Sequence, residues 1–151
     1  MKIIKQLVLT SILVLFASAV FAETKMRITL QLPLKAHLGQ NLLVFKKELE
    51  KRSDIIVEIY DSAQLYKDKE VPQAVGSGAI EAGVASLTRF AGTNPEVDIF
   101  YLPFLFDSEK KIRKATKSGS KIRQVLDPAI SKSGAVPLYY QAYGSAVMLS
   151  N

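Results

Sequence analysis

The stretch MRITLQLPLKAHLGQNLLVFKKELEKRSDIIVEIY, Met26–Tyr60, changes its hydrophobic period twice. Met26–Leu32 alternates apolar and polar side chains, which predicts a strand. From Leu38 the apolar side chains recur at helical spacing, which predicts an amphipathic helix of about four turns. Ile55–Tyr60 is rich in β-branched residues and predicts a second strand. Two strands joined through a helix favour parallel pairing, because parallel strands need a long crossover connection.

Helices and strands continue to alternate through the rest of the chain. The predicted elements are, in order, a helix from Lys69 that is capped by Asp68 and ended by Gly76-Ser77-Gly78, a strand Ala79–Ser86, a helix from Asp107-Ser108 to Thr116, a helix after Ser120 that ends at Gly134, and a strand Val136–Tyr143. Val97–Phe106 is strongly apolar and aromatic and is expected to build core. The sequence therefore predicts an α/β fold with a mostly parallel sheet and helices on both faces.

The first residues predict export. Lys2 and Lys5 precede an apolar stretch, and Val20-Phe21-Ala22 places small residues where a signal peptidase cleaves. We therefore interpret residues 1–22 as a signal peptide that is cleaved after Ala22. An anchoring helix is the alternative, but the stretch is short for a bilayer, which needs about 20 apolar residues. We expect a periplasmic protein with no stable membrane insertion after cleavage.

Charge and composition narrow the function classes. The predicted signal carries two lysines and no acids, so the formal charge falls from +6 to +4 on cleavage. The remaining cations lie between apolar positions of predicted helices, which is typical of solvated helix faces, so no nucleic-acid partner is expected. The sequence has no cysteine and a single histidine, His37. No cofactor, no metal and no enzymatic activity are therefore expected, and an exported hydrolase that uses His37 is kept as an alternative.

Four stretches taken together resemble a known family. They are HLGQNLLVFKKELEKRS followed by IIVEIYDSAQL, then EVPQAVGSGAIEAGVASLTRF, then DIFYLPFLF. In this order they resemble the extracytoplasmic solute-binding proteins of TRAP transporters, the DctP family. The resemblance implies two α/β lobes that are joined by hinge strands and that close on a ligand. It further implies that residues 23–143 form the first lobe, and that residues 144–151 are a truncated hinge strand of a truncated chain.

The resemblance also implies a set of ligand-binding residues. Gln31 matches a ligand-contacting position, His37 lies in the loop that follows, and Ser86 takes a position that often faces the cleft. Arg89 matches a basic position, and its planar guanidinium suits a carboxylate. A structural role at a helix N-terminus or in a salt bridge between the two lobes is the alternative for Arg89. Glu70 is placed near the cleft, with a capping role at the helix start as its alternative.

One departure weakens the inference of a carboxylate ligand. Many members of the family have Gly-x-Arg after the strand that here ends near Tyr143, whereas residues 144–151 contain no arginine. The implied function is a periplasmic receptor that captures an organic acid or related polar solute and delivers it to the TRAP membrane permease. A non-binding fragment from a disrupted gene is the main alternative.

Overall fold

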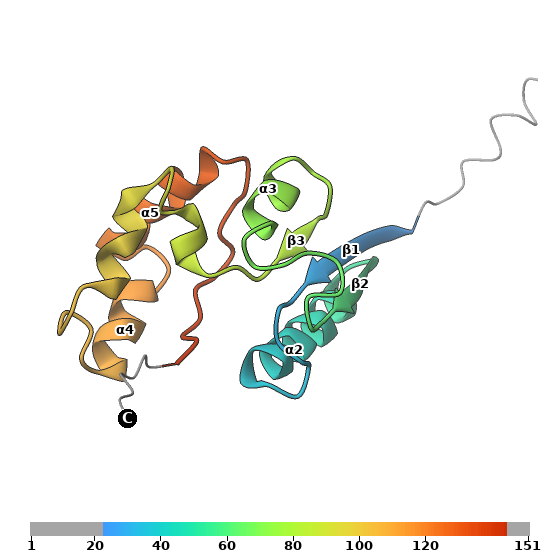
Figure 1. Cartoon of the computed structure of the whole chain (residues 1–151). Coiled ribbons are helices and arrows are strands. Elements are labelled where there is room, and N and C mark those ends of the chain that lie inside the picture. The colour runs from blue at the N-terminus through green and yellow to red at the C-terminus, as the bar shows by residue number, and fades with distance from the viewer. Residues whose placement is uncertain (1–22, 145–151) are drawn as a thin grey trace, which may run out of the picture.

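The computed structural model describes residues 23–144. The predicted signal peptide and all but the first residue of the predicted hinge strand lie outside this range. Three parallel strands, β1 (Thr24–Thr29), β2 (Ile55–Tyr60) and β3 (Ala82–Gly83), form a sheet in the order β2-β1-β3. Two helices, α2 (His37–Arg52) and α3 (Val71–Gly76), connect them. We call these five elements the sheet half (Figure 1).

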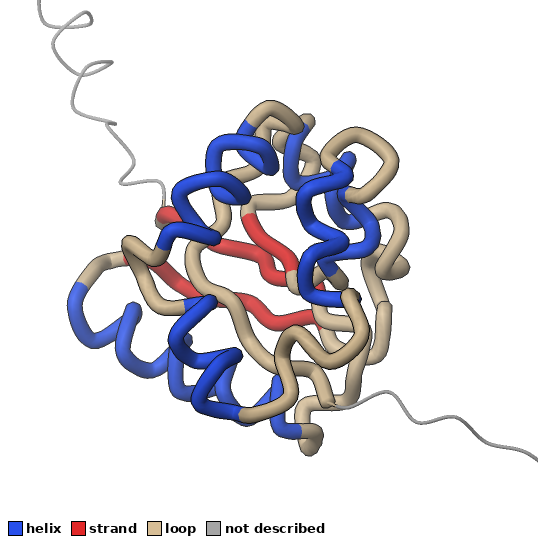
Figure 2. The backbone as a smooth tube through the Cα atoms, turned by 90° about the vertical axis from the view of Figure 1, so that its left-hand side faces the viewer, coloured by secondary structure: helices blue, strands red, loops and turns tan. Residues whose placement is uncertain are grey.

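Helices α2 and α3 cover opposite faces of the sheet, as predicted, and successive side chains of β1 point to these two faces in turn (Figure 2). One face packs against α2 in a buried cluster, whose members are Ile28, Leu30, Leu38, Leu42 and Val57. Thr29 lies on the other face, and a Cβ at Gly83 would lie 2.5 Å from Val71 Cγ1 of α3 and 3.1 Å from Thr29 Cγ2. Glycine at position 83 therefore permits the close approach of α3 to the sheet.

β3 is much shorter than the predicted strand Ala79–Ser86. The Glu81 carboxylate takes the place of a strand partner, because its Oε2 accepts hydrogen bonds from Arg27 N at 2.9 Å and from Arg27 Nε at 2.8 Å. Arg27 Nη2 also donates to Ala79 O at 3.1 Å and to Glu81 Oε1 at 2.7 Å. Side-chain contacts thus continue the attachment of this segment to β1 beyond the two residues of backbone pairing.

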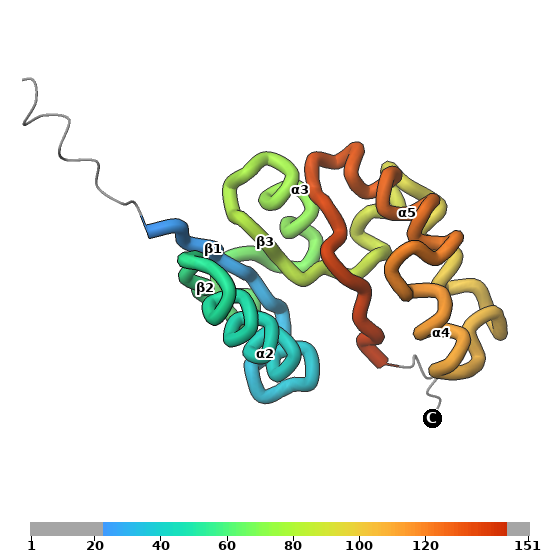
Figure 3. The backbone as a smooth tube through the Cα atoms, turned by 180° about the vertical axis from the view of Figure 1, so that it is seen from behind, coloured from blue at the N-terminus to red at the C-terminus, as the bar shows by residue number. Residues whose placement is uncertain are grey.

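The remaining elements form a helical half, which comprises two 3-10 helices, η1 (Leu87–Phe90) and η2 (Pro95–Tyr101), and two α-helices, α4 (Glu109–Thr116) and α5 (Lys121–Ser131). The buried members of its hydrophobic cluster are Phe90, Val97, Leu126 and Ile130. Ser120 caps α5 by accepting from Arg123 N at 3.1 Å, so the predicted helix start is confirmed. Figures 1 and 3 show the sheet half and the helical half side by side.

Two predictions for the second part of the chain are wrong. Val97–Phe106 is core only in its first part: Val97 is fully buried, but η2 ends at Tyr101 and Phe104 is 92% exposed. Val136–Tyr143 is extended but joins no sheet within residues 23–144, because no strand pairs with it there. It instead runs between the two halves (Figure 3).

Candidate functional site

The carboxyl end of the sheet brings the ends of β1 and β3 together. Thr29 pairs with Gly83, and Val84 N donates to Thr29 O at 2.9 Å. Because the two strands are parallel, Gln31 and Ser86 leave the sheet at the same end. Ligands of open parallel sheets bind beyond this end of the strands. This edge is therefore the candidate site.

A tight turn after β2 fixes the backbone on both sides of Gln31. Ala63 N donates to Leu30 O at 2.9 Å, and Ser62 N donates to Leu32 O at 3.2 Å. Ser62 and Ala63 have φ values of 51° and 57°, in the left-handed region that non-glycine residues rarely adopt. Backbone of this kind tends to cluster at functional sites. The position of Gln31 is thus determined by the turn as well as by the sheet.

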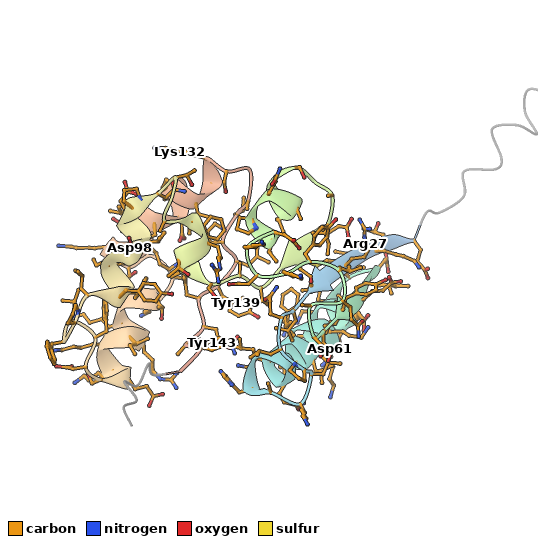
Figure 4. The ribbon with its side chains drawn as sticks, viewed as in Figure 1. Arg27, Asp61, Asp98, Lys132, Tyr139 and Tyr143 are labelled. Atoms are coloured by element: carbon orange, nitrogen blue, oxygen red, sulfur yellow. The ribbon has the colours of Figure 1, made fainter. Side chains whose placement is uncertain are left out.

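Asp61 stabilises the same turn, a role that the sequence analysis did not assign. Its Oδ2 accepts from Leu34 N at 2.9 Å, and its Oδ1 accepts from Gln64 Nε2 at 3.3 Å. Figure 4 shows Asp61 beside the loop that leads into α2. Residues Tyr60–Leu65 therefore connect the ends of β1 and β2. They lie within a stretch that resembles the DctP family, and this resemblance could have indicated the role of Asp61.

Gln31 lies two residues beyond the end of β1, and its side chain is partly buried. Its Nε2 is buried and has no hydrogen-bond partner within the described residues. A buried donor without an acceptor costs about 1–3 kcal/mol, which an added acceptor would relieve.

Asp68, Ser86 and Arg89 meet beside this edge. Asp68 Oδ2 lies 2.5 Å from Arg89 Nε, and Asp68 Oδ1 accepts from Ser86 N at 2.9 Å. Burial by itself raises the pKa of Asp68, but the hydrogen bonds from Arg89 and Ser86 outweigh it and lower the pKa below 3.8. The prediction that Asp68 caps a helix from Lys69 is wrong, because α3 begins at Val71. The predicted site residues Ser86 and Arg89 are brought together by Asp68, which the sequence analysis interpreted as a helix cap.

Glu70 lies near this group but has a local partner. Its side chain is exposed, and its Oε2 accepts from Lys67 N at 2.8 Å. Glu70 is the residue before α3, yet its side chain makes no capping hydrogen bond to the helix. It therefore stabilises the loop of residues 67–70.

His37 is placed apart from the Asp68 group. It is the first residue of α2, where its Nε2 lies 3.3 Å from Ala142 O. Its ring meets that of Tyr143 edge-on, with centroids 6.5 Å apart. His37 thus belongs to the contact between α2 and the extended segment 136–143, and four of the five predicted residues belong to the carboxyl end of the sheet.

The extended segment is attached to the helical half through Tyr140. Tyr140 Oη donates to Asp127 Oδ1 at 2.8 Å, and Asp127 Oδ2 lies 2.8 Å from Arg123 Nη2. The Arg123 guanidinium stacks over the Tyr140 ring at 5.0 Å. Burial, together with the bond to Asp127, raises the pKa of Tyr140. This group fixes the path of the segment, which the prediction of a strand did not foresee.

A cavity of about 410 Å³ lies between α2 and this segment. Its lining residues are Asn41, Val44, Phe45, Tyr139, Tyr140 and Gln141. Tyr139 packs against Phe45 with ring centroids 6.4 Å apart, and Figure 4 shows Tyr139 and Tyr143 between the two halves. A second cavity of about 490 Å³ lies in the helical half, between η2 and α5. Neither of these two cavities is lined by a predicted site residue.

Neither a metal-binding cluster nor a membrane-spanning helix is found in residues 23–144. No group of three or more histidine, cysteine, aspartate or glutamate side chains is arranged to hold a metal ion in this range. Over the same residues, every helix is too short or too polar to span a membrane.

Solved structures are similar to this chain in fold. A TRAP periplasmic solute-binding protein of Pseudomonas aeruginosa with bound L-malate is 25% identical, with a TM-score of 0.69 over 77% of this chain and 40% of its own. A TRAP periplasmic solute-binding protein of Polaromonas with bound D-erythronate has the same identity and TM-score, over 78% of this chain and 39% of its own. A Bordetella pertussis receptor that binds pyroglutamic acid is 26% identical, with a TM-score of 0.63 over 74% of this chain and 36% of its own.

Sequence comparison leads to the same family. The C4-dicarboxylate-binding periplasmic protein DctP of Rhodobacter capsulatus is 28% identical over 116 residues, which is 75% of this chain and 34% of that protein. The chain thus spans about a third of the length of this relative. The family model of the bacterial extracellular solute-binding proteins, family 7, matches residues 30–151. The chain therefore belongs to the DctP family of bacterial extracellular solute-binding proteins.

Proposed function

We propose that this chain is the ligand-capturing first lobe of a TRAP-type solute receptor, which binds an organic acid in the periplasm and delivers it to the membrane permease. Residues 1–22 act as the signal peptide, with cleavage after Ala22. The observation that supports the proposal best is the group at the carboxyl end of the sheet, where Asp68 holds Arg89 beside Ser86. The organic acids in the similar structures supply the ligand class.

Arg89 is the proposed contact for the ligand acid. Only its Nε is used by Asp68, and the terminal nitrogens make no hydrogen bond within residues 23–144. Two terminal N–H groups in one plane match the two oxygens of a carboxylate. The Gln31 amide, on the adjacent strand end, is the proposed donor to a second oxygen of the ligand. Glu70 and His37 are proposed as further ligand contacts, although their described partners are Lys67 N and Ala142 O.

Capture requires no chemical step. A receptor of two lobes closes when its ligand binds the closed form more tightly than the open form. Closure removes water from the acid and strengthens its contact with Arg89. The described contacts of His37 are a backbone carbonyl and an aromatic ring, and neither supports the hydrolase alternative.

Thermal unfolding of residues 23–151 with L-malate, succinate, D-erythronate and pyroglutamic acid tests the proposal. A ligand at 100 times its Kd should stabilise the protein by roughly 2.7 kcal/mol. Arg89→Gln should abolish this shift, whereas Arg113→Gln, on the exposed face of α4 and paired with Glu109, should retain it. Equal loss in both variants, or no shift with any acid, would argue against a binding site at Arg89 and would favour a non-binding fragment.

A further inference from the structure

The Asp68 carboxylate uses both of its oxygens within the protein. Oδ2 contacts Arg89 Nε at 2.5 Å, and Oδ1 accepts from Ser86 N at 2.9 Å. Asp68 belongs to the loop before α3, whereas Ser86 and Arg89 follow β3. The carboxylate therefore joins two segments at one end of the sheet and holds the guanidinium in a fixed place relative to both.

The two side chains of this pair differ in how far they face solvent. The Arg89 side chain is 46% exposed and that of Asp68 is 23% exposed. Arg89 is therefore the more accessible member of the pair for a ligand, and its terminal nitrogens are not used by Asp68. Ionised Asp68 nevertheless cancels the charge of Arg89, and the pair as a whole is neutral.

We propose that Asp68 is a specificity-determining residue, which limits the site to one carboxylate and favours monoanionic hydroxy or cyclic-amide acids over dicarboxylates. This inference rests on the proposed function. Arg89 offers directed hydrogen bonds to the first carboxylate, but Asp68 already neutralises its charge, so the pair gives no net attraction for a second carboxylate. The other charged residues nearby, Lys67, Lys69 and Glu70, are more open to water, so solvent and salt screen them. Among the charged side chains of residues 67–70, Asp68 is therefore the least exposed to water.

The amide at Gln31 is consistent with this selectivity. Gln31 carries no charge, and its unpartnered Nε2, within the part of the chain that the structure describes, requires an acceptor. A hydroxyl or carbonyl oxygen of a monoacid supplies one without a second negative charge. A second carboxylate would also supply one, but it would bring a second negative charge that the neutral Asp68–Arg89 pair does not compensate.

The test compares the affinities of residues 23–151 for D-erythronate, pyroglutamate and succinate at neutral pH, by titration followed through the Arg89 Nε–H resonance. The wild type should bind both monoacids more tightly than succinate. Asp68→Asn retains an oxygen acceptor but removes the charge, and it should shift the succinate-to-monoacid affinity ratio by about tenfold toward succinate. Asp68→Glu restores the charge and should retain the monoacid preference.

Asp54→Asn is the matched control, because it makes the same change of charge just before β2, at the opposite end of the sheet. It should leave the ratio unchanged. Three results would overturn this inference alone: a wild type that prefers succinate, an equal shift in both asparagine variants, or a shift in Asp68→Glu as large as that in Asp68→Asn. If none of the three acids changed the Arg89 Nε–H resonance of the wild type, the proposed function would be overturned instead. Asp68→Glu also provides a reading if Asp68→Asn fails to fold.

Discussion

Ser62 and Ala63 show how single residues can be strained to position a site. Each has a left-handed backbone, which costs an L-residue about 1–2 kcal/mol relative to the usual regions. Their N–H groups satisfy the carbonyls of Leu32 and Leu30, so the strain is offset by hydrogen bonds that hold Gln31 between them. The proposed ligand contact at Gln31 is thus built by a turn on the neighbouring strand.

Replacing Ala63 by glycine tests this strain. Glycine adopts a φ of 57° without steric cost, so Ala63→Gly should raise the free energy of unfolding by about 0.5–1 kcal/mol. Ala91→Gly is the control of opposite sign, because Ala91 has a φ of −59° and should lose stability. Urea denaturation measures both changes. Destabilisation by Ala63→Gly would show that the side chain contributes more than the strain costs.

At the scale of elements, an ion pair extends the short backbone attachment of β3 to β1. Backbone pairing covers only Ala82 and Gly83, and Glu81 adds contacts to the backbone and side chain of Arg27. The hydrogen bonds from Arg27 lower the pKa of Glu81 from 4.5 to about 2. A carboxyl whose pKa is depressed in the folded state stabilises the fold when the pH is above its ordinary, unfolded-state pKa. This contribution is lost as the pH falls through the folded-state pKa.

The stability of the sheet should therefore decrease between pH 4.5 and about 2 as Glu81 is protonated. Both side chains are about two-fifths exposed, at 41% and 39%, so screening keeps the effect small. Glu81→Gln should lower the Tm at neutral pH and flatten this part of the Tm–pH curve. Glu96→Gln, on the exposed side of η2, is the control, and equal flattening in both variants would refute the assignment to Glu81.

At the scale of the whole molecule, two glycines bring the halves into contact. A Cβ at Gly76, the last residue of α3, would overlap Ser133 O, and a Cβ at Gly134 would lie 2.5 Å from Gly76 O. Gly134 also has a φ of 84°. The backbones after α3 and after α5 therefore touch directly, and this contact joins the sheet half to the helical half (Figures 1 and 3).

Gly76→Ala should force these backbones apart and lower the free energy of unfolding by about 1–3 kcal/mol, the usual cost of overpacking. Gly92→Ala is the matched control, because a Cβ there meets nothing within 4 Å. Differential scanning calorimetry measures the change, and limited proteolysis should detect easier cleavage near Ser133. If both variants had the same stability, the halves would not depend on this contact.

Local patterning was sufficient for the elements that bury one face against a neighbour in sequence. The period of two in Met26–Leu32 and the helical period from Leu38 predicted β1 and α2, because each pattern fits a single surface. It failed for Ala79–Ser86 and Val136–Tyr143. Strand pairing there depends on partners that the segment itself does not specify, and apolar alternation alone does not supply them.

The fold class, the family and the segments that supply the candidate site follow from the amino-acid sequence, because hydrophobic period and the order of motifs are properties of the chain. Which side chains contact one another follows from the folded structure. Asp68 is a plausible cap in sequence, yet it binds Arg89 across 21 positions, and His37 meets Ala142 across 105. Such contacts depend on how strands and loops converge in space. The local hydrophobic pattern relates only residues that are close in sequence, so it carries no information about these contacts.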